Sequence, residues 1–63
     1  MIEADVSLFA ELLHSRFGAH AAAEAQRRAR HFDEAGDVRN AHAWRLIMQH
    51  VRAMKHAPPQ RSA

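Results

Sequence analysis

Histidine is the first residue type in this sequence to suggest chemistry, because neutral imidazole is a common metal ligand. The chain of 63 residues contains six histidines, at the following positions: His14, His20, His31, His42, His50 and His56. Two ligands on one helix need a spacing of three or four residues, so that both side chains lie on the same face. Successive histidines are 6, 11, 11, 8 and 6 residues apart. No pair has the required spacing, and we predict no metal site and no cofactor.

Nucleophilic catalysis needs an activated cysteine, serine or lysine. The chain has no cysteine, which also excludes disulfides and thiolate metal ligands. Ser15 follows His14 directly, but adjacent positions on a helix diverge by about 100° and do not form a dyad. The carboxylates Asp33, Glu34 and Asp37 surround a turn, where helix capping explains them. We therefore predict no catalytic residues and no enzyme activity.

Positive charge is concentrated near the C-terminus, where every ionisable residue after Asp37 is basic or histidine. Steps of three, four, three and four residues place a polar stripe on one helix face: His42, Arg45, Gln49, Arg52 and His56. As a candidate anion-binding face, this stripe would attract an acidic protein, a nucleic acid backbone or an anionic membrane. The simpler interpretation, which we favour, is a solvated face whose bases complement the negative end of the helix dipole.

Arginines on an earlier segment are a second source of positive charge. Arg27, Arg28 and Arg30 would extend the candidate anion-binding face only if their helix presents them on the same side as Arg45 and Arg52. The formal net charge is only +2 at pH 7. The stripe also lacks the interleaved aromatic residues of single-stranded nucleic acid binders. A nucleic-acid-associated regulatory protein is therefore our alternative hypothesis and not the leading one.

Apolar residues at helical spacing predict three helices that position these side chains. In the first, over residues 2–17, apolar residues recur at steps of four, three, four and four: Ile2, Val6, Phe9, Leu13 and Phe17. The second covers residues 19–35 and is rich in alanine, a strong helix former, and the third covers residues 38–56. Gly18 and Gly36 follow the first two helices as C-terminal caps, and Asp37 is placed to cap the third.

The connections between these helices predict the architecture. A short turn at Gly36 and Asp37 makes the second and third helices an antiparallel hairpin, and the first packs across it. We expect one all-α domain over residues 1–57, followed by a flexible tail over residues 58–63 that begins with two prolines. Aromatic rings form the expected centre of the core: Phe9, Phe17, Phe32 and Trp44.

The chain has more large apolar side chains than a thin three-helix core of this size can easily bury. A domain of about 60 residues buries only about 60% of the surface that its unfolded chain exposes, and small domains often need a partner. Exposed apolar residues that occur singly are normal, but a patch usually indicates a binding surface. We favour the second interpretation and predict a protein interface at these residues: Leu8, Leu12, Leu46, Met48 and Met54.

A recognisable series of residues extends over most of the chain. They are Phe17-Gly18, then Ala25, Arg28 and Ala29, then Ala35-Gly36-Asp37, and then Trp44, Ile47 and Val51. This pattern, over roughly residues 8–54, resembles a family of short uncharacterised α-helical bacterial proteins, widespread in alphaproteobacteria. The resemblance implies an all-α fold and no particular activity. The spacing is also similar, more weakly, to a single tetratricopeptide-type helical hairpin, a unit that needs about three stacked repeats for stability.

Together these features indicate a non-catalytic helical protein. The leading hypothesis is a protein–protein interaction module or accessory subunit that binds itself or a larger protein through an apolar helix surface. No segment approaches the ~20 apolar residues of a transmembrane helix. The N-terminus is acidic and lacks the basic region of a signal peptide. We therefore expect a soluble, cytoplasmic protein.

Overall fold

The computed structural model describes residues 3–56, which are helical except for one short turn. Helix α1 spans Glu3–Phe17, the 3-10 segment η1 spans Gly18–His20, α2 spans Ala21–Glu34 and α3 spans Val38–His56. No strand occurs within this range, so the all-α prediction is confirmed. The tail predicted over residues 58–63 lies outside the described residues.

The first two predicted helices are not separated by a loop. Backbone helicity continues from Glu3 to Glu34, and η1 is a tighter segment within that run. Gly18 has a φ of +54°, a left-handed conformation that glycine adopts at low cost, and it bends the run into α1 and α2. The described chain therefore forms two continuous helical runs, 3–34 and 38–56, where three separate helices were predicted. Alanine on both sides of His20 lets helical geometry resume at once after the bend.

The turn between α2 and α3 carries the two caps that the sequence predicts. Gly36, with a φ of +77°, donates its N–H to the carbonyl of Asp33 at 3.0 Å, and Asp37 donates to the carbonyl of Phe32 at 2.8 Å. This pair of bonds is a Schellman motif, which satisfies carbonyls at the end of α2. Asp37 then accepts the backbone N–H of Asn40 at 3.2 Å and its side-chain amide at 2.7 Å. These bonds lower the pKa of Asp37 and make it the N-cap of α3.

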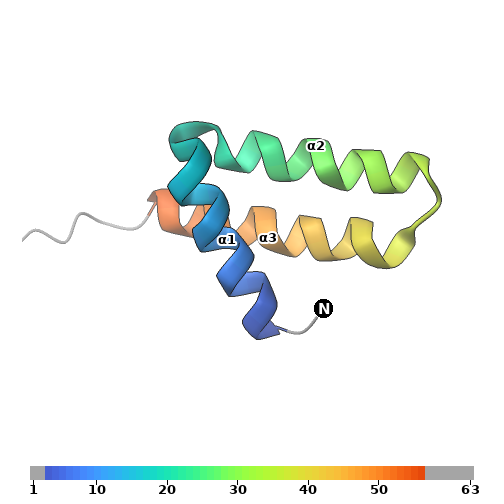
Figure 1. Cartoon of the computed structure of the whole chain (residues 1–63), viewed down its shortest axis with the longest axis horizontal. Coiled ribbons are helices and arrows are strands. Elements are labelled where there is room, and N and C mark those ends of the chain that lie inside the picture. Colours follow the sequence, from blue (N-terminus) through green and yellow to red (C-terminus); the bar gives the residue numbers. More distant parts are fainter. Residues whose placement is uncertain (1–2, 57–63) are drawn as a thin grey trace, which may run out of the picture.

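The tight turn places α2 and α3 side by side and antiparallel, and α1 crosses α3 at a steep angle (Figure 1). Helix α1 packs mainly against α3 and less against α2. The order of packing agrees with the predicted hairpin and crossing helix. The hairpin therefore forms a platform, and α1 presents one face to it and the other to solvent.

Small side chains fill the centre of the core. Ile47 and Val51 are the largest fully buried side chains, and Ala21, Ala25 and Ala29 of α2 belong to the same buried cluster. Ala41 and Ala43 of α3 are also buried. Val6, Ala10 and Leu13 close the core from α1, together with Trp44. Packing alanine against alanine lets two helices approach closely, which leaves little space for rings between them.

The prediction that four aromatic rings form the centre of the core is wrong for three of them. Trp44 is buried, but Phe9 is 37% exposed. Phe17 and Phe32 are only partly buried and pack against the outside of the core. Because the alanine contacts hold the helices close together, the phenylalanine rings lie at the rim of the helix interfaces.

Candidate functional site

Helix α1 has a second apolar face, which the core does not use. Leu8 is 53% exposed and Leu12 is 50% exposed, one turn further along the helix. Phe9 lies between them in sequence and is also exposed. We call Leu8, Phe9 and Leu12 the outer apolar patch. Val6, Ala10 and Leu13, on the adjacent side of α1, are buried, so the helix can pack its core without this patch.

A charged residue stands at each end of the outer apolar patch. Asp5, Phe9, Leu12 and Arg16 follow one another at steps of four, three and four residues, which places them on one face of α1. Asp5 is half-buried and Arg16 is exposed. Within residues 3–56 neither side chain forms an ion pair. The face is therefore acidic at its N-terminal end, apolar in the middle and basic at its C-terminal end.

A groove of about 270 Å³ adjoins this face. Its walls come from α1 and from the α2–α3 hairpin: Phe9, Leu12, Leu13, Arg16, Phe17, Arg28 and Trp44. The ring of Phe9 is tilted by 55° to that of Trp44, with 6.1 Å between the ring centroids. Phe9 therefore belongs both to the outer apolar patch and to the wall of the groove.

Ion pairs on α2 accompany Arg28 at the hairpin wall of the groove. The guanidinium carbon of Arg28 lies 5.0 Å from the centroid of Trp44, and its Nε donates to Glu24 at 2.6 Å. Arg27 donates to the same carboxylate at 2.8 and 3.2 Å. The hydrogen bonds from Arg27 and then Arg28 lower the pKa of Glu24 from 4.5 to about 2. Glu24 is thus ionised at neutral pH and fixes Arg28 over the indole.

The predicted anion-binding face lies along the solvent side of α3. His42, Arg45, Gln49 and Arg52 are all exposed there, and the side chain of His56 lies outside the described residues. Arg45 forms an ion pair with Asp33 of α2. Of the arginines that could extend this face, Arg27 and Arg28 are bonded to Glu24. Part of the positive charge in this region is therefore balanced by carboxylates of α2.

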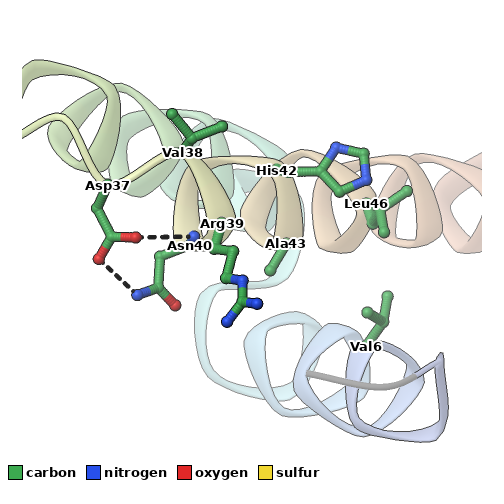
Figure 2. Close-up of a pocket in the computed structure, with 8 residues that line it drawn as sticks. All are labelled: Val6, Asp37, Val38, Arg39, Asn40, His42, Ala43 and Leu46. Atoms are coloured by element: carbon green, nitrogen blue, oxygen red, sulfur yellow. Dashed lines mark hydrogen bonds between the residues drawn. The ribbon is translucent and has the colours of Figure 1, made fainter.

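The other predicted interface residues do not join Leu8 and Leu12. Leu46, Met48 and Met54 are half-buried and pack against the core, because α1 and the hairpin cover much of their surface. Leu46 lines a separate open groove of about 880 Å³ between α1 and the start of α3 (Figure 2), which Val6, Val38 and His42 also line. Met48 lines a shallow hollow of about 170 Å³ beside Arg45. Leu8 with Leu12, Leu46, and Met48 therefore lie on three separate surfaces.

Sequence reasoning missed three members of the α1 face. Phe9 was assigned to the core because it is in step with Val6 and Leu13, and the significance of Asp5 and Arg16 was not recognised. A signal was present, since the spacing of Asp5, Phe9, Leu12 and Arg16 is itself helical. Val38, which is 76% exposed near the start of α3, was also not identified as an exposed apolar residue.

Clusters that could hold a metal ion were sought among the described side chains. No group of three or more histidine, cysteine, aspartate or glutamate side chains lies close enough together there. Over the same range, no helix has the length and apolar character that crossing a bilayer requires.

Comparison with known proteins found no match to this chain among family models, curated proteins or solved structures. The resemblance to short alphaproteobacterial proteins therefore stays a prediction.

Proposed function

We propose that this chain is a non-catalytic protein–protein interaction module, and that it binds itself or a larger protein through the outer apolar patch of α1. The observation that carries the proposal is the exposure of two leucines one turn apart, Leu8 and Leu12, on a helix that already has a buried face. With Phe9 between them, they form a contiguous apolar surface and not scattered single residues.

Burial of this patch would release a sizeable free energy. Removing apolar surface from water contributes about 25 cal/mol per Å², so three half-exposed large side chains represent a substantial gain on binding.

The test compares variants of the patch with a matched control on the same helix. Leu8→Glu combined with Leu12→Glu places charge on the patch, whereas His14→Glu places charge at an exposed position on another side of α1. Light scattering across a dilution series reports self-association, and affinity capture with each variant as bait reports a different partner. We expect the double variant to lose the association that wild type and His14→Glu retain. If the double variant still associates fully, the patch is not the binding surface.

The alternative, a nucleic-acid-associated regulator that uses the basic side of α2 and α3, has less support. The carboxylates of Glu24 and Asp33 pair with three of the arginines that it would use, namely Arg27, Arg28 and Arg45. Binding to phosphates would have to displace or outweigh these pairs. Steeply salt-dependent binding to DNA or RNA would favour this alternative over the interaction module.

A further inference from the structure

We propose that the occupant of the outer apolar patch is a second copy of this chain, with the two α1 helices packed side by side and antiparallel. This inference rests on the proposed function and adds the identity of the partner and the register of the contact. The order of charged and apolar residues along one face of α1 favours this partner, and that face carries Asp5, Phe9, Leu12 and Arg16.

The residues of this face are symmetric about one point. Asp5 and Arg16 lie equally far from the midpoint between Ala10 and Glu11, and so do Phe9 and Leu12. A two-fold axis through that midpoint, perpendicular to the helices, places each Asp5 opposite the second copy's Arg16. The same axis places each Phe9 opposite the second copy's Leu12. A two-fold interface must be self-complementary, and this face meets that requirement by pairing opposite charges with each other and apolar residues with each other.

A parallel arrangement of the same helices lacks this complementarity. It would place Asp5 beside the second copy's Asp5, and Arg16 beside the second copy's Arg16. Like charges at an interface are unfavourable and exclude wrong registers. The charge order of α1 therefore favours the antiparallel pair.

The groove beside the patch supports the same register. Arg16 of α1 and Arg28 of α2 both line it, and Arg28 is already bonded to Glu24. The antiparallel register brings the second copy's Asp5 to Arg16, a residue that lines the groove. It also brings the second copy's Leu12 against Phe9, whose ring forms a wall of the groove beside Trp44.

The contact is short, so the association should depend strongly on concentration. Fifteen residues at 1.5 Å each give α1 a length of about 22 Å, and the interface has only a few large apolar residues from each copy. Interfaces of this kind are at the small end of the range for specific complexes. We expect a monomer–dimer equilibrium at low ionic strength, where the Asp5–Arg16 pairs are least screened.

Charge exchange tests the register directly. Asp5→Arg and Arg16→Asp each place like charges opposite each other in the homodimer, and each should weaken dimerisation roughly tenfold or more. An equimolar mixture of the two variants makes both contacts attractive again and should restore dimerisation to the wild-type level. Sedimentation equilibrium gives the dimerisation constants, and circular dichroism shows whether each variant is folded. Any cost of a variant within its own helix persists in the mixture, so recovery reports the contact between chains.

A milder pair of variants keeps the test decisive if a charge-reversed chain does not fold. Asp5→Asn and Arg16→Gln each remove the attraction without adding repulsion. Because they remove the same contact, the double variant should weaken dimerisation by less than the sum of the two single effects. Additive effects would overturn the register.

The possible outcomes separate this inference from the function on which it rests. Monomeric wild type up to about 1 mM, or a mixture of charge-reversed variants that does not recover, overturns the antiparallel dimer. The proposed function survives either result if Leu8→Glu with Leu12→Glu still abolishes binding to a partner. If wild type dimerises and that patch variant dimerises equally well, both proposals are wrong.

Discussion

Arg28 of α2 lies over the indole of Trp44 on α3, with 5.0 Å between the guanidinium carbon and the ring centroid. Phe9 of α1 contacts the same indole from another side, at 6.1 Å between centroids. One ring therefore connects all three helices, at the edge of the groove that adjoins the outer apolar patch. This position makes Trp44 both a core residue and the support of the candidate binding surface.

Removing the indole should destabilise the whole molecule. We expect Trp44→Ala to lower the free energy of unfolding by about 3–5 kcal/mol, since it leaves a cavity and removes the contacts of Phe9 and Arg28. A loss of that size is comparable to the total stability of many small domains. Thermal and urea unfolding followed by circular dichroism measure it. Val38→Ala, at an exposed position on the same helix, is the control and should change stability by less than about 0.5 kcal/mol.

Two leucines on α1 should differ sharply in their importance for folding. Leu13 is 5% exposed, and Leu13→Ala should cost about 2–5 kcal/mol of stability. Leu8 belongs to the outer apolar patch, and Leu8→Ala should cost less than about 0.5 kcal/mol in the monomer. Urea unfolding at low protein concentration compares the two. A large loss for Leu8→Ala in the monomer would mean that α1 packs with a different face towards the hairpin.

Glu24 makes the stability of the protein depend on pH. Its pKa is about 2 in the folded protein, lowered from its ordinary value of 4.5, so the unfolded chain takes up a proton first as the pH falls. The stabilisation from this carboxylate is therefore complete above pH 4.5 and is lost as the pH falls towards 2. Urea midpoints across this window should fall more steeply for wild type than for Glu24→Gln. Glu11→Gln, which removes an exposed carboxylate on α1, is the control.

Replacing Gly36 should lower the stability of the protein because of the backbone conformation at this position. Its φ is +77°, and a Cβ at this position would meet no atom within 4 Å. Gly36→Ala should therefore lower stability by about 1–2 kcal/mol through the left-handed conformation alone. Gly36→Asn should lose less, because asparagine tolerates this conformation better. Equal losses for the two variants, measured by thermal unfolding, would point to a steric clash.

Local signals in the sequence were sufficient to predict the turn and the last helix. The helix predicted over 38–56 matches α3, and Gly36 and Asp37 cap the helices as expected. These features depend on residues within a few positions of each other, where backbone chemistry decides the outcome. The bend at Gly18 was predicted as a break, because the sequence does not reveal that helicity resumes at once.

Features that depend on how helices cross were predicted less well. The prediction placed Phe9 in the core, since one helical stripe contains Val6, Phe9 and Leu13, but Phe9 is 37% exposed in the structure. Leu46, which was expected to be a surplus apolar residue, is half-buried and packs against the core. Leu8 and Leu12 are off that stripe in the sequence and are exposed in the structure. Periodicity alone was therefore enough to distinguish them from the buried residues of α1.

The alanine contact between α2 and α3 has a mechanical consequence. Alanine has no side-chain rotamers, so the α2 side of this contact, where Ala21, Ala25 and Ala29 are buried, has no alternative packing to adopt when a load is applied. Helix α1 is attached differently, through larger side chains and a left-handed glycine at its end. A force exerted on α1 by a bound molecule would therefore change the angle at Gly18 before it changed the spacing of the hairpin. We therefore expect the α2–α3 hairpin to keep its geometry while α1 changes its angle to it.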